Sequence, residues 1–307
     1  MLLFLLFKVL QISIEMIIDR SNEYSELLSV LQKVQPFWYF PSSGNGGDAL
    51  IAHATFDFFR RNSLRYQIYS AEKFDGRGTV VIGGGGGFVD GYRKMADLVS
   101  HLSLIAESVV VLPSSCFGYE ETLAKMDSRF HFFARESVTA EHVQRKSAGA
   151  KVSWCHDMAI SYVAPLGFAD APLPWALRGQ PIDYQIKWFL KRGKVSELIH
   201  KKLPVTFMLR GDRESAQAPD AKPPNNYDIS HLIKGKMDRE DRAYSIAQAF
   251  CHVVARQQQI VTDRLHVSIA CGLFDVPCEM RANHYHKNQA IFQESIRKFF
   301  PRVAFSR

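Results

Sequence analysis

The stretch FWYFPSSGNGGDALIAHATFDFFRR, from Phe37 to Arg61, decides the expected fold of this chain. It begins with an aromatic run, Phe37–Phe40, that has the length and composition of a buried strand. A glycine-rich loop follows, and then a helix-length segment, Asp48–Arg61. A strand, a loop and a helix in this order form the repeating unit of a sheet with parallel strands.

The same alternation continues towards the C-terminus in two series. Continuous apolar strands separated by helices are typical of parallel sheets covered on both faces. We therefore expect an α/β protein with two Rossmann-like domains that face a central cleft. In the first series we expect strands at Arg65–Tyr69, Thr79–Ile82, Ser108–Leu112 and Phe130–Ala134, with helices at Tyr92–Leu104 and Ser137–Arg145. In the second we expect strands at Val205–Leu209, Gln259–Thr262 and Val276–Met280, with helices at Arg239–Gln257 and Leu265–Cys271.

The segment Pro165–Gly193, rich in proline and glycine, separates the two series and favours a linker over a packed element. We expect an N-terminal Rossmann-like domain over 1–168, a linker over 169–193 and a C-terminal Rossmann-like domain over 194–290. A C-terminal helix is expected over 291–307, and a crossing back to the N-terminal domain is one option for it.

The composition excludes several classes of protein. The 307 residues are 47% hydrophobic and 22% charged, which excludes a disordered, collagen-like or coiled-coil chain. The net charge of +7 fits an anionic small molecule, a lipid phosphate or nucleic acid. Lysine and arginine are spread along the chain and no nucleic-acid-binding module is recognisable, so we expect no nucleic acid as partner.

The cysteine pattern and the N-terminal segment indicate where in the cell the protein is found. Five cysteines without a CxxC pair favour neither a disulfide framework nor a zinc ribbon, so we expect a cytoplasmic protein. The apolar segment Met1–Ile18 contains Lys8 and Glu15, and it has neither the length of a membrane span nor the flanks of a signal peptide. We expect an amphipathic or buried leader, with peripheral contact at the inner face of the cell membrane as the lesser alternative.

In such sheets ligands bind at the carboxyl ends of the strands, so the loops after each strand are the places to look for chemistry. In Ser42–Asp48, glycines and a helix N-terminus favour a bound ligand, with Asn45 and Asp48 as polar contacts; a turn merely capped by Asp48 is the alternative. The run Gly83–Gly87 fits neither a dinucleotide fingerprint nor a Walker A loop. It indicates a close approach of the backbone to a ligand or to the opposing domain.

Two further loops follow strands of the first series. Arg135 stands between a strand and a helix, where it can bind a carboxylate or phosphate in bidentate fashion, or form a structural ion pair. Cys155, His156 and Asp157 are adjacent, so their side chains diverge and cannot share one metal ion. We expect no metal here, and we expect Asp157 to line the cleft.

In the second series, charged residues follow three strands. Arg210 and Asp212 can surround a sugar or an anion, although a solvated charged turn is the alternative. Arg264 and His266 begin a helix, where backbone donors favour phosphate and a histidine can act as general acid or base. Lys287 lies close enough in such a domain to reach an anion held by Arg264 and His266.

Together these segments resemble the polysaccharide pyruvyltransferase family, whose motifs occur here in the same order. The resemblance extends from about Phe37 to Phe292. The tail departs from the family pattern at His286, which is often glycine there. The matching segments are Gly44–Asp48, Gly83–Gly87, Arg135–Ser137, His156–Ala159, Leu209–Glu214, Thr262–His266 and Asn283–Asn288.

The resemblance implies a fold similar to GT-B glycosyltransferases and the transfer of pyruvate from phosphoenolpyruvate to two sugar hydroxyls as a cyclic ketal. It implies phosphoenolpyruvate as co-substrate, no further cofactor, and a sugar or lipid-linked oligosaccharide as acceptor in the synthesis of a surface polysaccharide. The implied catalytic residues are His266, Arg264 and Arg135. The implied donor-binding residues are Arg135, Arg264, His266, Lys287, Gly84 and Gly85, and those of the acceptor side or cleft are Asn45, Asp48, Asp157, Arg210 and Asp212.

Two other functions remain open at this point. A GT-B glycosyltransferase that uses a nucleotide sugar would share the architecture and the basic cleft. A non-catalytic protein, either a nucleic-acid binder or a degenerate enzyme that serves as a scaffold, is the other alternative.

Overall fold

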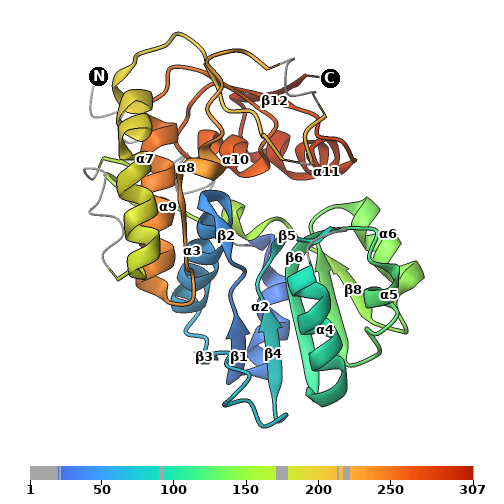
Figure 1. Ribbon diagram of the computed structural model, residues 1–307. Coiled ribbons are helices and arrows are strands. Elements are labelled where there is room, and N and C mark those ends of the chain that lie inside the picture. Colours follow the sequence, from blue (N-terminus) through green and yellow to red (C-terminus); the bar gives the residue numbers. More distant parts are fainter. Residues whose placement is uncertain are drawn as a thin grey trace, which may run out of the picture.

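The computed structural model describes residues 20, 22–89, 93–170, 179–212, 214–216 and 222–306. The leader Met1–Ile18 and part of the expected linker, 171–178, lie outside the described residues. The fold is α/β with parallel sheets, as expected, and consists of a Rossmann-like sheet and a second, smaller parallel sheet (Figure 1).

The larger sheet has seven strands: six lie in the order β3-β1-β4-β6-β7-β8, and β5 pairs with β6 beside this path. All of these pairings are parallel. Its strands are β1 (Phe37–Phe40), β3 (Tyr66–Ile68), β4 (Thr79–Ile82), β5 (Gly85–Val89), β6 (Ser108–Phe117), β7 (Phe130–Ala134) and β8 (Lys151–Trp154).

The strand order of this sheet reverses direction between β1 and β4. Strand β3 lies on one side of β1, while β4 and the later strands follow on the other. At such a switch point the loops after the two central strands turn away from each other and leave a crevice for a ligand. The topology therefore predicts a ligand crevice at the loops after β1 and β4.

The smaller sheet has the order β13-β12-β11-β9, again with parallel pairings only. Its strands are β9 (Thr206–Phe207), β11 (Ile260–Thr262), β12 (Cys278–Arg281) and β13 (Val303–Ser306). A third sheet consists of two antiparallel strands, β2 (Gly44–Asn45) and β10 (Lys234–Gly235).

The helices cover both faces of the larger sheet because successive strand residues point to opposite faces. Val80 and Ile82 of β4 pack in one apolar cluster with α4, and Val81 packs in another with α3. The helices are α2 (Ser25–Val34), α3 (Gly46–Arg61), α4 (Arg93–Ile105), α5 (Glu120–Leu123), α6 (Ser137–Lys146), α7 (Ile182–His200), α8 (Ile229–Leu232), α9 (Glu240–Ala255), α10 (Leu265–Leu273), α11 (Lys287–Ile291) and α12 (Arg297–Phe299).

Helix α3 packs against α9 and also contacts α10, at the start of which His266 lies (Figure 1). One apolar cluster contains Leu50 of α3, Phe250 of α9 and Ile260 of the smaller sheet. The amide of Gly46 also donates a hydrogen bond to the carbonyl of Ile233, at 3.0 Å. Because the apolar core is continuous through both halves, the division into two domains that face a cleft stays a prediction.

The glycine run differs from the loop expected over Gly83–Gly87. From Gly85 onward it forms β5, which pairs with an extended β6 that runs to Phe117 instead of ending at Leu112. The pairing of β6 with its other neighbour, β7, shifts register between Val111 and Ser114, because Pro113 cannot donate a hydrogen bond to β7. This irregularity is a β-bulge, and β6 continues beyond it, past the end of its apolar run.

Two segments expected from the sequence have a different structure. The expected linker over 169–193 is helical from Ile182, where α7 begins after Pro181. The expected C-terminal helix over 291–307 contains a π-helical turn, Phe292–Ile296, and α12, but its last residues form β13 at the edge of the smaller sheet. Glu294 of the π-helical turn accepts a hydrogen bond from the hydroxyl of Ser137, at the start of α6.

Candidate functional site

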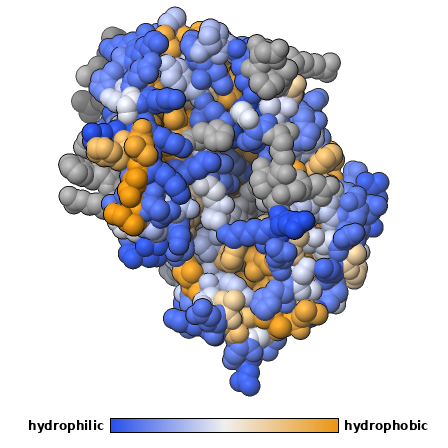
Figure 2. Space-filling model, viewed as in Figure 1, coloured by the Kyte–Doolittle hydropathy of each residue, from blue (hydrophilic) through white to orange (hydrophobic). Residues whose placement is uncertain are grey.

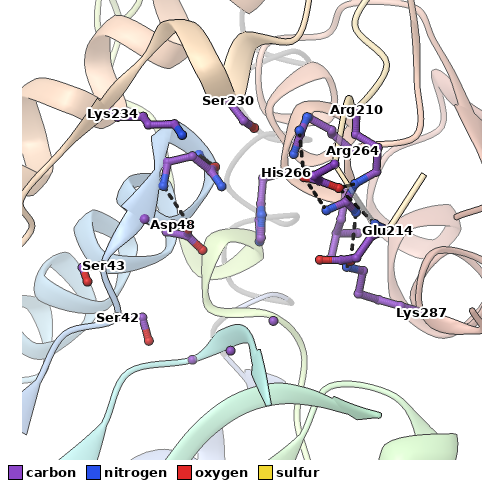
Figure 3. Close-up of a pocket in the computed structure, with 18 of the residues that line it drawn as sticks. Ser42, Ser43, Asp48, Arg210, Glu214, Ser230, Lys234, Arg264, His266 and Lys287 are labelled. Atoms are coloured by element: carbon purple, nitrogen blue, oxygen red, sulfur yellow. Dashed lines mark hydrogen bonds and ion pairs between the residues drawn. The ribbon is translucent and has the colours of Figure 1, made fainter. Parts of the chain in front are cut away.

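A pocket of about 470 Å³ lies where the carboxyl ends of strands from both sheets meet. Loops after β1, β4 and β7 form one part of its wall, and loops after β9, β11 and β12 form another. Figure 3 shows His266 between a group of charged side chains and a second group that includes Asp48 and Lys234. Residues with charged side chains in the wall are Asp48, Lys94, Arg135, Arg210, Asp212, Glu214, Lys234, Arg264, His266 and Lys287.

Arg135 reaches the pocket from the end of β7 and is held by a buried carboxylate. Its Nη1 donates to Asp157 Oδ2 at 2.6 Å, and its Nε donates to the hydroxyl of Ser115 at 2.8 Å. Arg135 is only 1% exposed, so its charge requires this partner. His266, at the start of α10, approaches the same carboxylate oxygen, with Nε2 3.4 Å away.

Asp157 therefore lies behind the pocket wall instead of within it. Its side chain is 0% exposed and its other oxygen accepts a hydrogen bond from the amide of Ala159. Burial alone would raise the pKa of Asp157, but the hydrogen bond with His266 and the charges of His266 and Arg135 lower it well below its usual value. The expectation that Asp157 lines the cleft is wrong, because both oxygens are used in holding the residues around it.

Arg210 and Arg264 share the carboxylate of Asp212. Arg210 Nε donates to Asp212 Oδ1 at 2.7 Å, and Arg264 Nη2 donates to Asp212 Oδ2 at 3.1 Å. Arg264 also pairs with Asp228, with Nη2 at 2.8 Å from Oδ2. Burial would raise the pKa of Asp212, but Arg210 and Arg264 lower it far below its usual range. The two guanidinium groups are thus fixed side by side before a ligand enters.

Lys287, the first residue of α11, reaches the pocket beside Arg135. Its Nζ lies 2.5 Å from Glu214 Oε2, which also accepts a hydrogen bond from Arg210 Nη1 at 2.9 Å. Burial lowers the pKa of Lys287 to about 8, although Glu214 opposes this shift. Burial would raise the pKa of Glu214, but Lys287 and Arg210 lower it to about 2.

The glycine run leaves open space beside these cations. A Cβ on Gly86 would lie 3.6 Å from Arg135 Nη2 and 3.9 Å from Lys287 Nζ. The missing side chain therefore frees room for a small anion next to both groups. Gly84 also lines the pocket, whereas Gly85, expected to bind the donor, lies outside the wall and has a φ of +128°, which favours glycine.

The loop after β1 caps helix α3 and lines the side of the pocket away from Arg264 and Lys287 (Figure 3). Asn45 Oδ1 accepts from the amide of Gly47, and Asp48 Oδ2 accepts from the amide of Asn45, each at 2.8 Å. This capping box satisfies two amides of the first helical turn, so both residues stabilise the helix as well as lining the pocket. Ser42 and Ser43 lie next to Asp48 in Figure 3.

In the triplet Cys155, His156 and Asp157, the histidine and the aspartate contact different partners. His156 is buried, with Nδ1 2.7 Å from the hydroxyl of Ser295, so it joins the strand end to the π-helical turn. No cluster of metal-ligating side chains occurs in the described part of the chain.

Nine of the eleven residues named from the sequence line one pocket. Sequence reasoning missed Glu214, although it stands in the Leu209–Glu214 motif, and it missed Asp228, which lies outside every motif. It also missed Lys94, Ser230 and Lys234, which lie outside the motifs, and it gave no role to Ser42 and Ser43, although both stand in the Ser42–Asp48 loop. The nine are Asn45, Asp48, Gly84, Arg135, Arg210, Asp212, Arg264, His266 and Lys287.

This arrangement suits a small, multiply charged anion held beside a histidine. Arginine binds carboxylate or phosphate through paired N–H donors, and lysine adds a compact charge. Serine hydroxyls and the carboxylate of Asp48 on the other wall suit a ligand with hydroxyl groups.

The family model described as Polysaccharide pyruvyl transferase matches residues 45–285 of this chain. A search of curated proteins gave no match. The chain is similar to a crystal structure titled as that of a functionally uncharacterized protein from Klebsiella pneumoniae subsp. pneumoniae NTUH-K2044, with a TM-score of 0.70 and 26% sequence identity. The alignment covers 94% of this chain and 98% of that chain.

Removal of the carboxylate at position 157 should strongly destabilise the protein. We expect Asp157→Ala to lower the free energy of unfolding by about 3–5 kcal/mol, because it leaves the buried charge of Arg135 without its partner. The matched control is Asp183→Ala, which breaks an exposed pair with Lys187 and should cost less than about 1 kcal/mol. Urea denaturation of both variants measures the difference, and equal losses would contradict the structural role of Asp157.

A side chain at position 86 should block the space beside Arg135 and Lys287. We expect Gly86→Val to weaken binding of inorganic phosphate at least about tenfold, an amount equal to about 1.4 kcal/mol, because the new methyl groups occupy the anion's position. Gly193→Val is the control, since a Cβ there meets nothing within 4 Å. Isothermal titration calorimetry measures the affinity, and unchanged binding by Gly86→Val would rule out an anion at this place.

Proposed function

Because the chain belongs to the polysaccharide pyruvyl transferase family, we propose that it transfers pyruvate from phosphoenolpyruvate to two hydroxyls of a sugar, as a cyclic ketal. The product is proposed to belong to an exopolysaccharide or another cell-surface polysaccharide. The acceptor is proposed to be a sugar unit, free or lipid-linked.

One observation carries this proposal: Arg135, Arg264 and Lys287, from three different loops, line one pocket together with His266. Figure 3 labels Arg264, Lys287 and His266. Phosphoenolpyruvate carries a carboxylate and a phosphate, so its binding requires several fixed cations within a small volume. The space beside Gly86 adjoins two of these cations. The wall with Ser42, Ser43 and Asp48 is then left for the acceptor hydroxyls.

The proposed reaction forms two C–O bonds and breaks one. The first sugar hydroxyl adds to C2 of phosphoenolpyruvate while C3 gains a proton and becomes a methyl group. The bond between C2 and the phosphate oxygen then breaks, and the second hydroxyl adds to C2. Of the two hydroxyl protons, one is balanced by the proton gained at C3 and the other leaves with the phosphate.

His266 is the proposed general acid and base of this sequence. Its Nε2 faces the carboxylate of Asp157, so a proton on Nε2 is held there and Nδ1 remains to exchange a proton with the substrates. Nδ1 lies on the side of Gly47, which also lines the pocket. Arg135, Arg264 and Lys287 stabilise the negative charge of the donor and of the departing phosphate.

Phosphate release separates the proposed reaction from transfer of a nucleotide sugar. We expect the protein to release phosphate from phosphoenolpyruvate only when a sugar acceptor is present. We expect His266→Ala to lower turnover at saturating donor about 10²–10⁴-fold, because it removes the proposed general acid and base. The Gly193→Val variant serves as an active control. Thermal stabilisation by nucleotide sugars without stabilisation by phosphoenolpyruvate, or near wild-type turnover of His266→Ala, would contradict the proposal.

The lowered pKa of Lys287 predicts an alkaline limit to donor capture. Below about pH 8 the amine is protonated and binds the donor; above it the charge is lost, so kcat/KM for phosphoenolpyruvate should fall about tenfold per pH unit. Lys287→Arg should move this decline to higher pH, because a guanidinium stays protonated. Lys146→Arg, on the exposed part of α6, should leave the profile unchanged, and an identical decline in both variants would exclude Lys287 as its source.

A further inference from the structure

Helix α7 presents a row of large apolar side chains to solvent. The spacing of these residues, by four, three and one positions, places them on one side of the helix. Figure 2 shows the apolar surface that they contribute over α7. A contiguous exposed apolar patch marks an interaction site, whereas single exposed residues are ordinary. The row consists of Ile182, Ile186, Phe189 and Leu190, which are 70, 55, 58 and 77% exposed.

The other side of α7 packs against the rest of the protein. Val195 and Leu198 are buried in the apolar core. Trp188 packs partly buried against the same cluster. Packing against the core therefore accounts for the apolar residues on this side of α7 only. It does not account for the exposed apolar row on the opposite side.

Basic residues run along the exposed row. Lys187, Lys191 and Lys194 follow one another at spacings of four and three, which places them beside the apolar row. Burial lowers the pKa of Lys191, and the charges of Lys234, Lys187 and Lys194 add to this effect, so these amines are close enough to repel each other. Such a cluster favours a bound anion.

A second cavity, of about 320 Å³, opens between α7 and the segment that leads to β10. Its wall combines three lysines with two aromatic rings, which suits a phosphate group attached to an apolar molecule. Lys234 belongs to the walls of both cavities, so the basic part of α7 adjoins the central pocket. The wall consists of Tyr184, Lys187, Trp188, Lys191, Leu232 and Lys234.

We propose that α7 docks this protein on the surface of an anionic phospholipid bilayer. The apolar row enters the headgroup region and the lysines bind lipid phosphates, which is the pattern of a helix that lies in the membrane interface. Among the described residues no helix is both long and apolar enough to cross a bilayer. The docked orientation turns the Lys234 side of the central pocket towards the membrane.

Vesicle flotation with the full-length protein tests this proposal without any assay of transfer, so its outcome is separate from that of the proposed function. The probes are vesicles of phosphatidylcholine alone and of equimolar phosphatidylcholine and phosphatidylglycerol. We expect binding to the anionic vesicles, weaker binding to the neutral ones, and a decrease at high salt, because salt screens the lysine charges.

Two pairs of substitutions separate the apolar and basic contributions. Ile186→Glu with Leu190→Glu should reduce binding to anionic vesicles about tenfold or more, and Lys187→Gln with Lys191→Gln should reduce it by a similar factor. The control is Leu104→Glu with Leu166→Glu, two apolar residues that are 82 and 106% exposed elsewhere. The control should bind as wild type, and unchanged melting temperatures confirm that all variants fold.

Several outcomes would overturn the proposal. Absence of binding to anionic vesicles would do so, as would equal binding by wild type and both α7 variants. Binding that persists in the α7 variants but is lost when residues 1–19 are deleted would assign the membrane contact to the leader. A dimer in solution that the Ile186→Glu and Leu190→Glu pair dissociates, without vesicle binding by wild type, would assign the apolar row to a second copy of the chain.

Discussion

The buried ion pair between Arg135 and Asp157 fixes the geometry on which the rest of the site depends. Arg135 ends β7, Asp157 follows β8, and His266, which approaches the same carboxylate, begins α10. One fully buried carboxylate thus connects both sheets. Since neither charge can be buried alone without a large penalty, only a narrow set of arrangements of these three elements is stable.

A similar pairing governs the other cations of the pocket. Arg210 and Arg264 are held by Asp212, and Glu214 accepts from Lys287. Side chains that are already oriented lose little entropy when a ligand arrives, and their fields act without reorganisation. The carboxylates also offset much of the positive charge, so the pocket suits a ligand that can use several N–H donors at once.

Much of the fold follows from local sequence. Phe37–Phe40, Thr79–Ile82 and Phe130–Ala134 have the expected bounds, because each is a short apolar run rich in β-branched or aromatic residues. Strand β5 was not expected, because glycines carry no strand preference and this strand exists only through its pairing with β6. Helix α7 was not predicted for two reasons. Prolines precede it, and its apolar residues lie on two sides of the helix, so they do not show the pattern of a single apolar face.

Which residues line the pocket was predictable to a similar degree. The rule that ligands bind at the carboxyl ends of parallel strands leads from the strand pattern to Arg135, Arg264 and His266. The burial of Asp157 was not predictable, because it depends on packing between segments more than 100 positions apart. Likewise, the partner of Lys287 lies 73 positions away, and no local pattern links the two.

Helix α3 belongs to the first half of the chain by sequence but to both halves by packing. Phe56 and Phe59 meet Tyr39 of the larger sheet edge to face, while Gly46 lies directly against Phe250 of α9. A chain cut between residues 169 and 193 would leave each fragment with an uncovered apolar surface where the other had been. The two fragments would then have to fold on one another. We therefore expect them to fold when they are produced together, but not when each is produced alone.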